Sequence, residues 1–98
     1  MARKRKFIDY EEVREIPIHE VAEWLGMRIR KDQSGWVMLE EDGKGETSLH
    51  LFNRNNKWKR FSGIEQNGVS QGSTMDLVMH INGVDFQEAA QQLSRQFL

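Results

Sequence analysis

Four short segments between Met27 and Phe61 alternate apolar and polar side chains, and this alternation limits the folds open to the chain more than any other feature. The segments read MRIRK, GWVMLEE, TSLHLFN and KWKRF. They are separated by turn residues, namely Ser34-Gly35, Asp42-Gly43 with Gly45, and Asn55-Asn56. Short strands joined by turns of a few residues pair in antiparallel fashion. We therefore expect a small four-stranded antiparallel sheet.

Three stretches outside these segments have the apolar spacing of a helix: residues 17–26, 73–83 and 85–97. Residues typical of helix ends bound them, namely Pro17 and Gly26, Ser73 or Thr74 and Asn82-Gly83, and Asp85 with Glu88. Residues 62–72 are polar and glycine-rich, so we expect a loop there. The predicted order is α-ββββ-αα, an α+β domain in which one N-terminal and two C-terminal helices pack on the sheet.

The apolar positions of these elements predict the core. If the helices cover one face of the sheet, the side chains that point toward them should be mostly buried. The predicted core residues are Leu49, Leu51, Phe61, Val78, Ile81, Phe86, Ala90 and Leu93.

The composition is that of a small globular domain. Of 98 residues, 38% are hydrophobic and 30% are charged, which favours one folded domain over a disordered chain. There is no cysteine, which excludes disulfide bonds and thiolate metal sites. No apolar run approaches the roughly 20 residues of a membrane span, and no signal peptide is visible. We expect a cytoplasmic protein with no membrane partner.

The net charge of −1 conceals a marked asymmetry along the chain. Residues 1–7 form a basic leader that we expect to be disordered, and residues 7–23 carry six acidic residues against one arginine. Residues 24–63 carry eight basic residues against five acidic ones, whereas the last 35 residues have four acids and a single arginine. A nucleic acid would therefore meet the middle of the chain.

The segment KWKRF is the most informative part of that middle region. Successive side chains of a strand point to opposite faces, so Trp58 and Arg60 share one face while Lys57, Lys59 and Phe61 share the other. One interpretation is an ordinary solvated strand with Trp58 packed inside. The other is a nucleic-acid platform, in which cations neutralise phosphates and an exposed aromatic ring stacks on bases. With basic residues on a neighbouring sheet edge, the predicted binding residues are Arg28, Arg30, Lys31, Arg54, Lys57, Trp58, Lys59 and Arg60.

No catalytic or metal-binding motif stands out. His19, His50 and His80 lack the spacing of a metal site, and Asp76 has no catalytic partner in the sequence. The segment NGVSQGS precedes a helix but lacks the lysine of a phosphate-binding loop. We expect a domain without enzymatic activity, without metal and without cofactor.

The helix IPIHEVAEWLG, the small sheet, the helix start GSTMDLVM and the final VDFQEAAQQL together resemble the N-terminal zinc-ribbon domain of bacterial primases. The resemblance is closest to primase-like proteins of conjugative and other mobile elements, and it covers roughly residues 8 to 97. It implies a zinc-ribbon-like sheet. It also implies contact with DNA, because that domain contacts template DNA in primases.

The zinc ligands of that family have no counterparts in this sequence. The family's Cys and His positions fall near Leu39, Asp42, Arg60 and Gly63, and apart from one possible carboxylate ligand at Asp42 these residues cannot form the sulfur and nitrogen shell of structural zinc. The resemblance therefore implies a degenerate ribbon without metal. We expect an apolar core to replace the stabilisation that zinc provides in small metal domains.

Two functions follow as expectations. The first is a non-catalytic DNA-binding module, residues 8–98 of a longer primase-like protein, that prefers single strands if an aromatic ring is exposed. It would serve DNA replication or transfer of a mobile element. The second is a protein-interaction domain that has lost DNA contact and docks a helicase, a relaxase or the rest of its own chain.

Overall fold

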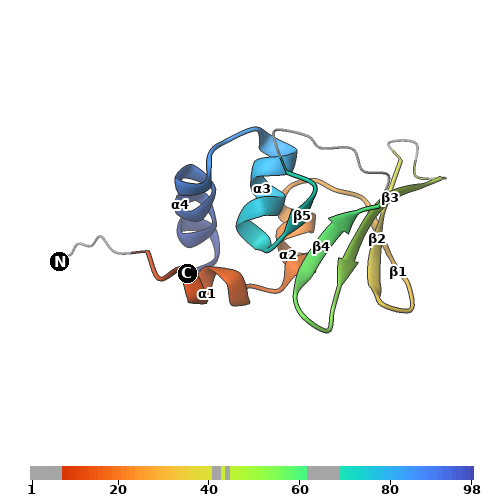
Figure 1. Ribbon diagram of the computed structural model, residues 1–98, viewed down its shortest axis with the longest axis horizontal. Coiled ribbons are helices and arrows are strands. Elements are labelled where there is room, and N and C mark those ends of the chain that lie inside the picture. The colour runs from red at the N-terminus through yellow and green to blue at the C-terminus, as the bar shows by residue number, and fades with distance from the viewer. Residues whose placement is uncertain (1–7, 41–42, 44, 62–68) are drawn as a thin grey trace.

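The structure is a computed structural model that describes residues 8–40, 43, 45–61 and 69–98. The basic leader, Asp42, Gly63 and most of the predicted loop after Phe61 lie outside the described residues. The helices and strands are, in order, α1 (Tyr10–Glu15), α2 (Ile18–Trp24), β1 (Ile29–Lys31), β2 (Gly35–Leu39), β3 (Glu46–Phe52), β4 (Lys57–Arg60), β5 (Gln71–Gly72), α3 (Thr74–Asn82) and α4 (Phe86–Phe97) (Figure 1).

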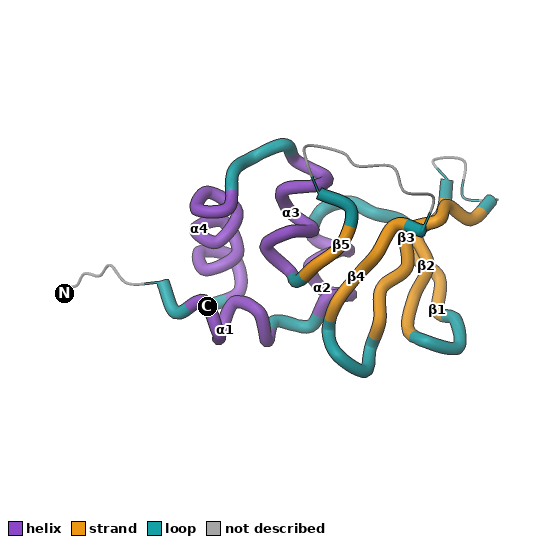
Figure 2. Tube along the Cα trace, in the orientation of Figure 1, coloured by secondary structure: helices purple, strands orange, loops and turns teal. Residues whose placement is uncertain are grey.

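The strands form one antiparallel sheet in the order β1-β2-β3-β4-β5, so each strand pairs with its neighbours in sequence (Figure 2). The α+β class and the four predicted strands are confirmed. The fifth strand, β5, falls in a stretch predicted as loop. It escaped prediction because two residues, Gln71 and Gly72, are too few to show alternation.

The turn between β3 and β4 is tied to the helices by one asparagine. Asn56 adopts a left-handed backbone conformation (φ 58°), which asparagine tolerates better than most residues. Its Nδ2 donates to the carbonyls of Arg14 (2.7 Å) and Ile16 (2.8 Å), and its Oδ1 accepts from the Ile18 N–H (2.9 Å). These bonds fix the tip of a hairpin against the junction of α1 and α2.

We expect Asn56→Ala to lower the free energy of unfolding by about 2–3 kcal/mol, because it removes three hydrogen bonds and puts alanine in a left-handed conformation. Chemical denaturation measures this change. Asn55→Ala is the matched control in the same turn: its side chain is exposed, so stability should change by less than about 0.5 kcal/mol. Equal stability of the two variants would contradict the role assigned to Asn56.

The first helix, α1, was not predicted. Its sequence YEEVRE buries only Val13, which is too little apolar periodicity to indicate a helix. Local capping helps to define its start, since the Asp9 carboxylate accepts from the N–H groups of Glu11 (3.0 Å) and Glu12 (3.3 Å). The predicted cap at Asp85 is confirmed, with Oδ1 accepting from the Glu88 N–H at 2.8 Å.

The helices form two layers on one side of the sheet. Helices α2 and α3 lie next to it, and α2 contacts β1 and β3 while α3 contacts β5 (Figure 1). Helix α4 packs against α1 and α3 and lies beyond α3, away from the sheet, in that view. The expectation that both C-terminal helices pack on the sheet therefore holds for α3, and α4 builds the outer layer instead. Of the helices in the described ranges, none has the length and apolar character to cross a bilayer.

The core lies between the sheet and these helices. Five of the predicted core residues are fully buried: Leu49, Leu51, Val78, Ala90 and Leu93. Two predictions were wrong, because Phe61 is 57% exposed and Phe86 is 40% exposed. Ile81 is partly buried and packs against the core. Trp58 takes the place assigned to Phe61 and is 1% exposed. Phe86 is exposed because it begins α4, where it stacks on Tyr10 at 5.5 Å rather than pointing inward.

Candidate nucleic-acid interface

The strand register separates the side chains of the sheet into two faces. Directly paired residues share a face, so Trp36, Leu51 and Trp58 form one row that joins the core. The adjacent row consists of Arg30, Val37, His50 and Lys59 and points the other way. No described helix covers that second side in Figure 1. We call it the open face. Its residues are Arg30, Ser48, His50, Phe52, Lys57, Lys59, Phe61 and Val37, of which Val37 is buried beneath its neighbours (1% exposed).

Three rings lie together on the open face. The ring centroid of Phe61 is 5.4 Å from that of His50 and 6.1 Å from that of Phe52, both at steep interplanar angles (76° and 89°). Edge-to-face arrangements of this kind are favourable between aromatic rings. Because Phe61 is 57% exposed while His50 and Phe52 are half-buried, the cluster presents one aromatic ring to solvent.

A network of polar contacts holds His50 in this cluster. Its Nδ1 lies 3.2 Å from Oδ2 of Asp32. The other carboxylate oxygen of Asp32 accepts from the N–H groups of Ser34 (2.9 Å) and Gly35 (2.8 Å) in the turn between β1 and β2. The aromatic cluster is therefore anchored to that turn.

Two lysines flank the rings. Lys57 pairs with Phe52 and Lys59 pairs with His50 across β3 and β4, and both lysines are exposed. The Nζ of Lys59 lies 5.2 Å from the ring centroid of Phe61, within the range of a cation–π contact. Neither lysine has an ion-pair partner among the described residues. Their charge is available to a ligand.

Trp58 does not belong to this interface, although the sequence pattern included it. The side chain is 1% exposed, and its Nε1 donates to the Ser73 carbonyl at 3.0 Å. A buried indole whose donor is satisfied in this way supports the fold and cannot stack on a base. The exposed ring of segment KWKRF is instead Phe61, which shares the open face with both lysines.

Arg60 also points to the helix side. Its Nε donates to Nε2 of His80 at 3.1 Å, and the Nδ1 of His80 lies 2.8 Å from the Val69 carbonyl, to which it donates in the matching tautomer. His80 is 0% exposed and its ring centroid lies 4.8 Å from that of Trp58. The position of Arg60 is thus set by contacts on the helix side of the sheet, and it does not share the open face with Lys57 and Lys59.

The remaining predicted cations do not all lie beside β4. Strand β1 is separated from β4 by β2 and β3, so the expectation that Arg28 and Arg30 lie on a neighbouring edge was wrong. Arg30 is on the open face but pairs with Glu46. Arg28 lines a pocket of about 880 Å³ on the helix side, together with Arg60. Lys31 and Arg54 lie at the hairpin turns and line a different pocket.

That 880 Å³ pocket contains two of the positions at which the resemblance places zinc ligands. Leu39 and Arg60 both line it, so the fold places these two residues near each other. Neither side chain is a zinc ligand. In the part of the chain that the structure describes, no group of three or more His, Cys, Asp or Glu residues could hold a metal ion. Asp42 and Gly63, the other two positions, lie outside the described residues.

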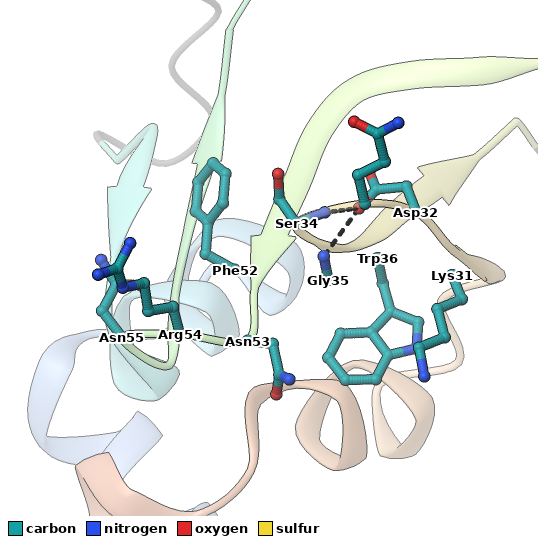
Figure 3. A pocket seen from close by; sticks show the side chains of 10 residues that line it. Lys31, Asp32, Ser34, Gly35, Trp36, Phe52, Asn53, Arg54 and Asn55 are labelled. Atoms are coloured by element: carbon teal, nitrogen blue, oxygen red, sulfur yellow. Dashed lines mark hydrogen bonds between the residues drawn. The ribbon is translucent and has the colours of Figure 1, made fainter.

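The pocket at the hairpin turns has a volume of about 510 Å³ and is built from two segments (Figure 3). Residues 31–36 of the β1–β2 hairpin form one wall, and residues 52–55 at the end of β3 form the other. Gly35 is required here, because a Cβ at this position would collide with the Leu51 carbonyl.

The sequence pattern alone did not identify Phe52, Phe61 and His50 as interface residues. The alternation in TSLHLFN and KWKRF shows which of these residues share a face. It does not show which of the two faces is left uncovered by helices. Comparison of the chain with protein-family models, with curated proteins and with solved structures gives no match.

Proposed function

We propose that this domain binds single-stranded DNA, without catalysis, through the open face of its sheet. The observation that carries the proposal is the position of Phe61. It is a large aromatic side chain, 57% exposed, on a sheet face that also presents Lys57 and Lys59. Exposed rings beside unpaired cations on a sheet are the features with which proteins bind single strands.

The chemistry of the open face suits a single strand better than a duplex. Unpaired bases expose their faces, and each base that stacks on an aromatic side chain contributes about 1–3 kcal/mol. In a duplex those faces are stacked within the helix, so Phe61 would have nothing to stack on. The lysines would contact phosphates of either form, which makes the aromatic ring the source of the strand preference.

The resemblance to the zinc-ribbon domain of primases supports the same function. It favours a metal-free ribbon that serves DNA replication or transfer in a primase-like protein of a mobile element, in the cytoplasm. A helicase or a relaxase is the kind of protein partner that such a role implies. The five-stranded antiparallel sheet with helices on one side is compatible with that proposal.

The lysines provide a test. In Lys57→Ala/Lys59→Ala, affinity for every single-stranded oligonucleotide should fall, and the slope of log K against log[salt] should shrink by about 1.4, since each lost phosphate contact contributes about 0.7. Fluorescence anisotropy at several salt concentrations measures both quantities.

The matched control is Arg14→Ala/Arg95→Ala, which removes two exposed cations from α1 and α4 and changes the net charge equally. Its affinity and salt slope should stay close to those of the parent protein. If the two double variants behave alike, net charge rather than the open face governs binding and the proposal fails.

A second candidate function rests on a different surface. Tyr10 and Phe86 are 37% and 40% exposed and stack on each other at 5.5 Å where α1 and α4 begin. Exposed aromatic residues are enriched in protein–protein interfaces. This pair favours a protein-docking role for the helical side, and that role takes precedence if the lysine variants bind oligonucleotides as tightly as the parent does.

A further inference from the structure

The aromatic cluster of the open face continues into the pocket at the hairpin turns. Phe52 contacts Phe61 on the open face, and the same residue lines the 510 Å³ pocket. A strand that stacks on Phe61 and follows the cluster past Phe52 therefore arrives at this pocket. Its volume falls within the range of small-ligand sites, roughly 300–1,000 Å³.

The pocket wall contains side-chain amides. Asn53 and Asn55 come from the turn after β3 (Figure 3). Gln33 comes from the turn between β1 and β2. A carboxamide both donates and accepts hydrogen bonds, and it can pair with the edge of a nucleobase through two bonds. Gln33, Asn53 and Asn55 are all exposed, so a ligand can reach them.

Cations and a fixed aromatic ring complete the pocket. Lys31 and Arg54 line it, and neither has an ion-pair partner among the described residues. The carboxylate of Asp32 already contacts His50 and two turn N–H groups, so the pocket favours an anionic ligand. Trp36 forms a further part of the wall, where its ring stacks on His19 at 4.4 Å and is thereby held in place.

We infer that this pocket receives one nucleotide of the bound strand and reads its base, which gives the domain a base preference. The inference rests on the proposed function. Lys31 and Arg54 contact the phosphate groups next to that nucleotide, and Asn53 and Asn55 bond to the base edge. The platform at Phe61 accepts any base, because every base has a face that can stack. Discrimination between bases therefore arises at the pocket.

The test uses oligo(dT), oligo(dC) and oligo(dA) of about twelve nucleotides, a length in the range that single-strand sites cover. We expect the parent protein to bind one of them about tenfold more tightly than the weakest. In Asn53→Ala/Asn55→Ala this ratio should fall to about twofold or less. Gln87→Ala/Gln96→Ala removes two exposed amides from α4 and should leave the ratio unchanged.

The outcomes separate the two proposals. If Phe61→Ala weakens binding of all three oligonucleotides but the parent shows no base preference, the platform stands and the pocket inference is wrong. The pocket inference is also wrong if the preference survives in Asn53→Ala/Asn55→Ala. If the parent binds none of the three, both proposals are wrong. Loss of the preference in the asparagine variant alone supports the pocket.

Discussion

Trp58→Ala should lower the free energy of unfolding by about 3–5 kcal/mol, a large share of the total stability of about 5–15 kcal/mol expected for a domain. The change empties the space of the largest fully buried side chain and leaves the Ser73 carbonyl without its indole donor. Chemical denaturation followed by circular dichroism measures the loss. DNA binding should weaken only in proportion to the fraction of unfolded protein.

A milder variant keeps this prediction testable if Trp58→Ala does not fold. Trp58→Phe retains an aromatic ring but lacks the N–H that bonds Ser73, so it should cost less than Trp58→Ala and still melt below the parent. A Trp58→Ala protein as stable as the parent would show that the assignment of this ring to the core is wrong.

Phe61→Ala should have the opposite effects to Trp58→Ala: it should weaken DNA binding while the protein remains folded. Its ring is the exposed member of the open-face cluster, so removing it should weaken single-strand binding by roughly 5- to 150-fold, which corresponds to about 1–3 kcal/mol of stacking. The salt slope should stay nearly unchanged, because stacking releases no counterions. Titration of labelled single-stranded and duplex oligonucleotides gives both values.

Phe86→Ala is the matched control, since this phenylalanine is also exposed but lies on α4. It should bind single strands as the parent does, and both phenylalanine variants should remain folded. If Phe86→Ala weakens binding while Phe61→Ala does not, the helical side is the interface.

The alternation of side chains was sufficient to predict the four main strands, because each buries one face and exposes the other. It could not predict which aromatic residue of KWKRF points inward. That depends on the register of β4 against β3, in which Trp58 pairs with buried Leu51 and Phe61 follows on the other face. The register is set by the turn around Asn56, whose bonds to α1 and α2 join residues about forty positions apart in sequence.

The sequence could not show that the cations of the predicted site lie apart in the fold, for a similar reason. The positions of basic residues in a sequence carry no information on strand order, and in the sheet β2 and β3 lie between β1 and β4. Arg60 is a further case, because its partner His80 comes from α3, twenty residues later in the chain. Lys57 and Lys59 were correctly placed on the face opposite Trp58, since alternation alone decides that relation.

Backbone amide chemical shifts, followed during titration with a single-stranded oligonucleotide, would show whether the open face binds single-stranded DNA. We expect the largest shifts at His50, Phe52, Lys57, Lys59 and Phe61, with little change along α4. Shifts confined to α1 and α4, or no shifts at all at saturating oligonucleotide, would contradict binding by the open face.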